Sequence, residues 1–259
     1  SFSVSPFMVF TDEMLTWPPD PDAWSLRWYK NMVGNCSADV VSSTVPCSNK
    51  WMIGTVNSFF IGFIATFIAT SLGTLAALGL SRPHMPYKGL IMAILISPMI
   101  VPLIITAAGM FFFYARINLV YSFTGIILAH VALATPFVVI TVTATLVGFD
   151  MNMVKASQSL GARPVRTFFK VIMPLILPGV ISGALFAFIT SFDEVVIVMF
   201  MASLDQLTIP KQMWAGIRQE ISPVILCMAT CLVVLSILLL TTVELLRRRS
   251  EKLRGITSR

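Results

Sequence analysis

Residues 51–80 read WMIGTVNSFFIGFIATFIATSLGTLAALGL and contain no charged side chain. A helix needs roughly 20 mostly apolar residues to cross a bilayer, and this stretch is longer than that. Four further stretches share its character, and the five run approximately over 51–80, 90–114, 119–147, 171–202 and 223–246. They lack the two-residue alternation that is typical of barrel strands. The sequence therefore predicts five spanning helices.

The composition of the whole chain favours lipid as its main solvent. Of the 259 residues, 56% are hydrophobic and only 12% are charged, whereas soluble domains carry about 25% charged residues. A soluble core of this size cannot bury so much apolar surface. The net charge of +6 does not indicate a nucleic-acid partner, because the basic residues lie between apolar stretches. We predict an all-α integral membrane protein that contacts the lipid bilayer and no nucleic acid.

Lys and Arg are divided unequally between the two predicted membrane sides. Cytoplasmic loops carry the excess of these residues. Twelve lie on one side (Arg82, Lys88, Lys155, Arg163, Arg166, Lys170, Arg247, Arg248, Arg249, Lys252, Arg254 and Arg259) and six on the other (Arg27, Lys30, Lys50, Arg116, Lys211 and Arg218). The first side is therefore predicted to be the cytoplasm. Residues 1–50 then form an extracytoplasmic segment, 51–246 the transmembrane domain and 247–259 a basic cytoplasmic tail.

The start of the chain leads to one further expectation. Ser1 is predicted to lie outside the cytoplasm, yet no signal-peptide pattern precedes it. We therefore expect that a sixth, N-terminal spanning helix belongs to the native protein, which would then have both ends inside.

The four cysteines form two pairs. Cys36 and Cys47 lie in the predicted extracytoplasmic segment, where oxidation is permitted. Their spacing allows either a small disulfide loop or two free thiols. Cys227 and Cys231 lie one helical turn apart in the last predicted span and are predicted to be packing residues.

The sequence lacks the common nucleotide-binding and catalytic patterns. It has no GxxxxGK[ST] loop and no HExxH motif. Its two histidines, His84 and His130, have no Cys or carboxylate near them in the sequence. We predict no enzymatic activity, no bound cofactor and no metal site. His130 falls inside the third predicted span, where it either lines a pathway or packs with a hydrogen-bond partner.

The predicted cytoplasmic loop over residues 149–170 is too long and too regular for a plain connector. Residues 151–160 are predicted to form a short helix with Met153, Ala156 and Leu160 near one face. Gly161 suits the left-handed residue that ends a helix. Because so short a helix is not stable alone, we expect it to dock into a groove of a partner protein or to lie on lipid as an amphipathic helix.

Two adjacent acids, Asp193 and Glu194, lie inside the fourth predicted span. A charge near the bilayer centre costs roughly 2.5–3.5 kcal/mol, so such a pair is predicted to be functional. Adjacent helix positions are about 100° apart, so one acid is expected to face a cation path, together with Ser191 and Phe192, while the other pairs elsewhere. The alternative is that both acids are hydrated near the outer end of a tilted or broken helix.

The loop over 149–170 resembles the EAA signature of permease subunits of ATP-binding-cassette importers, and we call it the coupling loop. The matching residues are Lys155, Ala156, Ser157, Gly161 and Pro174. Lys155 departs from the usual Glu, and Ser157 from the usual second Ala. In that family the signature forms a helix that sits in a cleft of the ATPase. The resemblance implies ATPase-coupling roles for Lys155, Ala156, Ser157, Leu160, Gly161, Arg163 and Pro174.

Other segments are similar to the spermidine/putrescine branch of these permeases, and they are SLRWY at 25–29, SFDE at 191–194, LTIP at 207–210 and ISP at 221–223. The resemblance implies a type I importer permease fold in the bacterial inner membrane and a path for polyamines opened by ATP-driven alternating access. It also implies three partners: a related second permease subunit, a dimer of ATPase subunits and a periplasmic substrate-binding protein. ATP and Mg²⁺ would then be bound by the ATPase and not by this chain.

Three other functions fit parts of the sequence. The same machinery would serve another substrate, such as 4-aminobutyrate, an opine or a metal complex. An ion-driven secondary transporter would use the acidic pair for protons or Na⁺, but it leaves the coupling loop unexplained. A scaffold that transports nothing would tolerate the loss of both acids.

Overall fold

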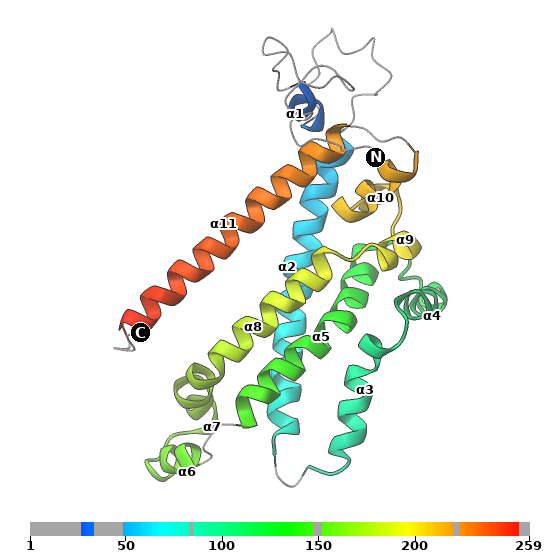
Figure 1. Cartoon of the computed structure of the whole chain (residues 1–259). Helices are drawn as coiled ribbons and strands as arrows, with labels where there is room; N and C mark the ends of the chain where they lie inside the picture. The colour runs from blue at the N-terminus through cyan, green and yellow to red at the C-terminus, as the bar shows by residue number, and fades with distance from the viewer. Residues whose placement is uncertain (1–26, 34–48, 83–84, 148–151, 220–222, 254–259) are drawn as a thin grey trace. The chain divides into compact units, whose positions relative to one another are not determined.

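The computed structural model describes residues 27–33, 49–82, 85–147, 152–219 and 223–253. Every regular element in these ranges is a helix (Figure 1). In chain order they are α1 (Arg27–Met32), α2 (Lys50–Leu80), α3 (Lys88–Ile100), α4 (Leu103–Arg116), α5 (Phe123–Val147), α6 (Asn152–Ser159), α7 (Pro164–Thr167), η4 (Phe168–Ile172), α8 (Met173–Phe192), α9 (Val196–Met201), η5 (Leu204–Gln206), α10 (Ile209–Gln219) and α11 (Pro223–Leu253). The chain divides into two units, residues 53–212 and residues 1–52 with 213–259.

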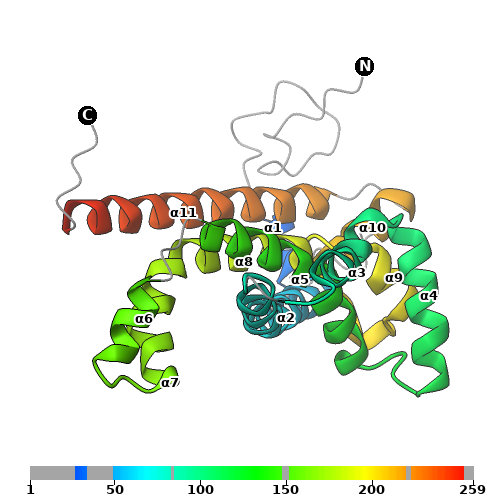
Figure 2. The same ribbon diagram turned by 90° about the horizontal axis from the view of Figure 1, so that it is seen from below.

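The unit formed by residues 53–212 is built around α2, α5 and α8, which lie side by side in both views (Figures 1 and 2). Small residues on α2 let its neighbours approach closely. A side chain on Gly73 would collide with Val138 of α5, and one on Gly62 would press on the ring of Phe188 of α8. Ala65, Ala69 and Ala77 of α2 are buried in the shared apolar core.

The contact between α5 and α8 depends on two glycines four residues apart. A Cβ on Gly183 would lie 2.5 Å from Thr141 Oγ1 and 3.0 Å from Val138 Cα, and one on Gly179 would collide with Thr145. The two threonine hydroxyls are satisfied within α5, because Thr141 donates to the Phe137 carbonyl and Thr145 to the Thr141 carbonyl, both at 2.9 Å. The helices can therefore pack closely without leaving these polar groups unpaired in the core.

The second predicted span is broken in the structure. α3 and α4 meet at a bend of 104°, whereas the sequence predicted one apolar stretch over 90–114. Val101 is extended, with φ −71° and ψ 138°, which is the conformation favoured before a proline. Pro102 also has no N–H for the helical ladder, so α4 begins anew after it.

The fourth predicted span also differs from a single helix. α8 stops at Phe192, and α9 starts after a three-residue break at 193–195. At its other end α8 is preceded by the wide helical turn η4. Pro174 explains the position of that turn, because a proline ring clashes with the carbonyl four residues earlier in a regular α-helix. Wide turns of this kind are frequent at functional sites.

Three helical stretches of the described chain are long and apolar enough to cross a membrane: α2, α5 and residues 164–192. The bent pair α3–α4 adds a fourth if it is counted as one span, and the described apolar part of α11, Val224–Leu238, is shorter. The chain is thus a multi-helix membrane protein. The number of five spans stays a prediction.

In the unit formed by residues 1–52 and 213–259, α1 packs against α11. Gly216 of α10 lies against Ile225 of α11 and leaves no room there for a side chain. Cys227 is buried, as the predicted packing role requires, whereas Cys231 is exposed, and both are free thiols. Cys36 and Cys47 lie outside the described residues.

Candidate functional site

The coupling loop contains the short helix that the sequence predicted. The structure describes the loop from residue 152, where α6 begins, and α6 ends at Ser159. Gly161 adopts a φ of +78°, and the next amide, that of Ala162, donates to the Ser157 carbonyl at 3.1 Å. The prediction of a left-handed glycine after the helix is confirmed. This turn reverses the chain and lets α7 start at Pro164.

A hydrogen bond between two hydroxyls holds α6 against α7. The Ser157 and Thr167 hydroxyl oxygens are 2.6 Å apart, and Thr167 is buried. Arg163 is the extended residue directly before α7, and Pro164 occupies the first turn, where its missing N–H is not needed. Nothing in the sequence pattern pointed to Thr167 as the partner of Ser157.

The outward surface of the coupling loop combines apolar and basic side chains. Leu160 is 88% exposed, Val165 68% and Met153 47%. Lys155, Ala156, Gly161 and Arg163 are exposed as well. Of the predicted coupling residues, Ser157 faces inward instead, and Pro174 lies apart in the first turn of α8. The structure therefore gathers five of the seven, Lys155, Ala156, Leu160, Gly161 and Arg163, in the exposed part of the loop.

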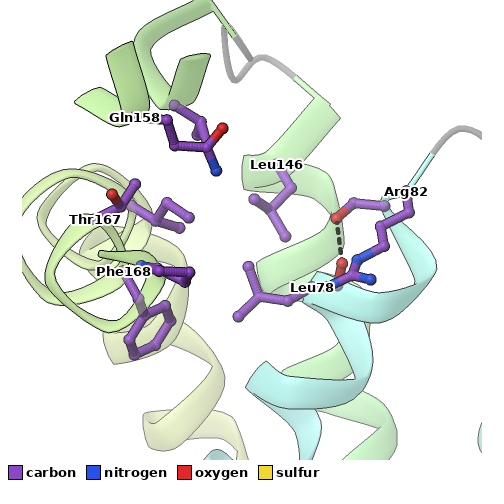
Figure 3. Close-up of a pocket in the computed structure, with 10 residues that line it drawn as sticks. Leu78, Arg82, Leu146, Gln158, Thr167 and Phe168 are labelled. Carbon is purple, nitrogen blue, oxygen red and sulfur yellow. Dashed lines mark hydrogen bonds between the residues drawn. The ribbon is translucent and has the colours of Figure 1, made fainter. Parts of the chain in front are cut away.

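A cavity of about 310 Å³ lies between the coupling loop and the ends of α2 and α5. Figure 3 shows Gln158, Thr167 and Phe168 on the loop side, opposite Leu78, Arg82 and Leu146. The dashed line marks the Ser81 hydroxyl donating to the Leu78 carbonyl at 3.0 Å. The loop is thus incompletely packed against the helix ends.

The two adjacent acids face different surroundings. Glu194 is only 7% exposed, and its Oε1 accepts the Ile197 N–H at 2.9 Å, which satisfies an amide in the first turn of α9. Asp193 is exposed, and its own N–H closes the last turn of α8 on the Ile189 carbonyl at 3.0 Å. Of the two, Asp193 is the carboxylate that remains accessible.

His130 and Ser191 are both buried and share a hydrogen bond of 2.8 Å between Nδ1 and Oγ. The structure therefore shows the packed, hydrogen-bonded arrangement for His130. Phe192 lies in an aromatic cluster, with ring centroids 5.2 Å from Phe59 and 5.5 Å from Phe188. Among the described residues, no three His, Cys, Asp or Glu side chains come together as metal ligands.

Side-chain hydrogen bonds fix the connection between α9 and α10. The Gln206 amide donates to the Tyr121 carbonyl at 2.7 Å, and the Asn57 amide to the Leu207 carbonyl at 2.9 Å. The Lys211 ammonium donates to the Ala202 carbonyl at 3.0 Å, just after α9, and burial lowers the pKa of Lys211 from its ordinary value. Sequence reasoning missed these contacts, although Ser203 and Gln206 have the spacing of a capping box.

Comparison with known proteins agrees with this arrangement. Residues 53–252 match the family described as binding-protein-dependent transport system inner membrane component. The chain is 29% identical to the spermidine/putrescine transport system permease protein PotC of Haemophilus influenzae, over 88% of this chain and 84% of that protein. It is 31% identical to the PotC protein of Escherichia coli K12 (73% and 72%) and 28% identical to the putrescine transport system permease protein PotI of the same strain (80% and 72%).

A solved structure shows the same fold. A chain of the MetNI methionine ABC transporter, in an inward-facing conformation, matches with a TM-score of 0.55 at 21% identity, over 79% of this chain and 95% of that one. The chain belongs to the family of binding-protein-dependent transport system inner membrane components, the permease subunits of ATP-binding-cassette importers.

Proposed function

We propose that this chain forms part of the translocation path of a polyamine importer and that it is driven by ATP hydrolysis in a partner subunit. The observation that carries the proposal is the layout of residues 152–195. The exposed coupling loop leads without a connecting loop into α8, and the accessible Asp193 directly follows α8. A surface suited to a partner protein and a carboxylate suited to a cation are therefore attached to the two ends of one helix.

The coupling loop is the part that would receive motion from the ATPase. Its exposed apolar side chains would fill a groove on the ATPase, and ATP binding there would shift α6 and α7 together through the Ser157–Thr167 hydrogen bond. Close packing of α8 on α5 through Gly183 would then move the two helices as one body. Alternating access follows if this shift opens the path to one side of the membrane at a time.

The proposed substrate is a cationic amine with a methylene chain. Asp193 provides a carboxylate, and attraction between it and an ammonium group increases as water leaves the path. Phe192 precedes it within the aromatic cluster, and aromatic faces attract cations as well. The relatives named above as spermidine/putrescine and putrescine permeases support this class. Glu194 contributes less, because its carboxylate is engaged with α9.

The proposed assembly has three kinds of partner. A second, related permease subunit would complete the path, two ATPase subunits would bind ATP and Mg²⁺, and a periplasmic binding protein would deliver the amine. The basic tail at 247–259 and the coupling loop would lie on the cytoplasmic side, because that side carries the excess of Lys and Arg. This chain would itself bind no nucleotide.

Uptake into proteoliposomes tests the proposal. The complete importer and its binding protein are reconstituted, and uptake of labelled putrescine and spermidine is compared with that of 4-aminobutyrate. We expect ATP-dependent uptake of the two polyamines. If only 4-aminobutyrate is taken up, the chain still belongs to an ATP-driven importer but the proposed substrate class is wrong. Polyamine uptake driven by an ion gradient without ATP would overturn the proposed mechanism.

A matched pair of glycine variants tests the role of the coupling loop in the same assay. Gly161→Val places a β-branched residue at positive φ, which costs about 1–2 kcal/mol and distorts the turn. Gly89→Val introduces the same side chain at an open helical position. We expect uptake to fall about tenfold or more in the first variant and to stay near the parent rate in the second.

A further inference from the structure

The coupling loop carries positive charge without compensating acid. Residues 151–192 contain no Asp or Glu. They contain four cations, Lys155, Arg163, Arg166 and Lys170, and all four are exposed. Among neighbouring elements, Arg82 at the end of α2 also borders the cavity beneath the loop. The nearest carboxylates in the sequence are Asp150, outside the described residues, and Asp193, at the far end of α8.

These cations share the coupling loop with exposed apolar side chains. Met153 of α6, Leu160 just after α6 and Val165 of α7 are all exposed. Lys155 belongs to the same helix, α6, as Met153, and Arg163 directly precedes α7, which contains Val165. Protein interfaces commonly combine apolar side chains at the centre with polar and charged side chains at the rim. The surface complementary to the coupling loop has an apolar floor and a negatively charged rim.

We propose that the groove on the ATPase subunit that receives this coupling loop has an acidic rim, with carboxylates opposite Lys155 and Arg163. The inference rests on the proposed function and adds the chemistry of the partner to it. Exposed like charges repel one another, so the isolated loop is electrostatically unfavourable, and an acidic rim removes that repulsion on docking. The charge pattern also restricts the choice of partner, because a basic groove would be rejected.

Anionic lipid headgroups are the other surface that a basic, partly apolar segment can bind. A helix that lies on lipid presents a large apolar face. On α6 and the turn after it, the exposed large apolar side chains are Met153 and Leu160, which make a small apolar face. The segment is also folded back on itself by the Gly161 turn. Figure 1 shows α6 beyond the end of α5, displaced along the direction of the helices. These features favour a protein groove.

Charge reversal tests the proposal in the assembled complex. The complex is placed in nanodiscs of neutral phosphatidylcholine, and retention of the ATPase subunit is measured at low and high salt. We expect Lys155→Glu with Arg163→Glu to weaken retention about tenfold or more at low salt. The control is Lys88→Glu, which makes the same charge change at an exposed position outside the loop. This control should retain the ATPase like the parent.

A compensating variant completes the test. Replacing the rim carboxylates of the ATPase with Lys should restore retention of the charge-reversed permease and weaken retention of the parent. The inference is overturned if charge reversal has no effect while Leu160→Asp releases the ATPase, and in that case the proposed function stands. It is also overturned if charge reversal acts only in nanodiscs that contain phosphatidylglycerol. If neither charge reversal nor Leu160→Asp changes retention, the proposed docking through this loop fails as well.

Discussion

The two ends of α8 are stabilised in opposite ways. At its start the coupling loop is held by local hydrogen bonds and one hydroxyl pair, and its large side chain Leu160 is almost fully exposed. At its end, Glu194 accepts the Ile197 N–H next to the break, and Asn57 and Gln206 tie the connection after α9 to distant parts of the chain. The first end leaves apolar side chains exposed, whereas the second pairs several of its polar groups within the chain.

The difference separates a part of the permease that is stabilised by contacts within one chain from a part that leaves apolar side chains exposed. A membrane core offers no water to unpaired polar groups, so an interrupted helix there has to bring its own partners, as Glu194 does for α9. A loop in water can leave apolar side chains exposed until another protein covers them. Substitutions in α8 itself and at each of its two ends should therefore have different effects.

The largest effect is expected from Gly183→Leu, because it disturbs the helix that both ends share. The added side chain would meet Thr141 and the backbone of Val138, and overpacking of this kind costs about 3 kcal/mol. Thermal unfolding and size-exclusion profiles of the detergent-solubilised complex should show a large loss of folded protein. Gly109→Leu, at an open position of α4, should behave like the parent.

Substitutions of the two adjacent acids should have different effects, one on transport and the other on stability. Asp193→Asn removes the accessible carboxylate, and loss of a hydrogen bond to a charged group should raise the half-saturating polyamine concentration about tenfold. Glu194→Ala removes the contact to the Ile197 amide and should lower the free energy of unfolding by about 1 kcal/mol. Uptake kinetics and thermal unfolding of both variants check this. If the two variants change uptake and stability equally, Asp193 and Glu194 do not have the separate roles proposed for them.

Lys211→Met should loosen the connection after α9. The ammonium that donates to the Ala202 carbonyl is lost while the methylene stem is kept, and we expect a local destabilisation of about 1 kcal/mol. Hydrogen exchange of the amides over 202–206 should become faster. Lys88→Met, which replaces an exposed lysine elsewhere, should leave these amides unchanged.

The smallest effect is expected from Ser157→Ala at the coupling loop. The variant leaves the buried Thr167 hydroxyl without its partner and should weaken the α6–α7 contact by about 1 kcal/mol or less. Hydrogen exchange over 152–167 should increase modestly. Ser159→Ala removes an exposed hydroxyl that only donates within α6, to the Lys155 carbonyl, so a comparable increase there would contradict the role given to the Ser157–Thr167 pair.

Sequence reasoning predicted best where a local rule determines the structure. The left-handed Gly161 and the short helix before it follow from the residue types at adjacent positions. The apolar stretches likewise fixed the helical class, because length and hydropathy are local properties. The close packing of α8 was also readable in principle, since Gly179 and Gly183 have the spacing of a membrane packing motif.

The breaks at Pro102 and after Phe192 could not be derived in the same way. Membrane helices tolerate proline when neighbours satisfy the freed backbone groups, and the chain sequence does not say which neighbours are present. The burial of Glu194 depends on its hydrogen bond with the backbone amide of Ile197 in α9. The partner of Lys211 is a backbone carbonyl. Backbone groups are the same at every residue, so the sequence does not show which of them a side chain will bind.

The role of the coupling loop is tested by ATP hydrolysis in the complex reconstituted in proteoliposomes. Hydrolysis should be compared between the parent and Leu160→Asp, with the binding protein and putrescine present. Putrescine should stimulate hydrolysis in the parent, and Leu160→Asp should abolish the stimulation while the permease subunits remain assembled. Full stimulation in Leu160→Asp would contradict the claim that the exposed end of α8 receives the motion of the ATPase.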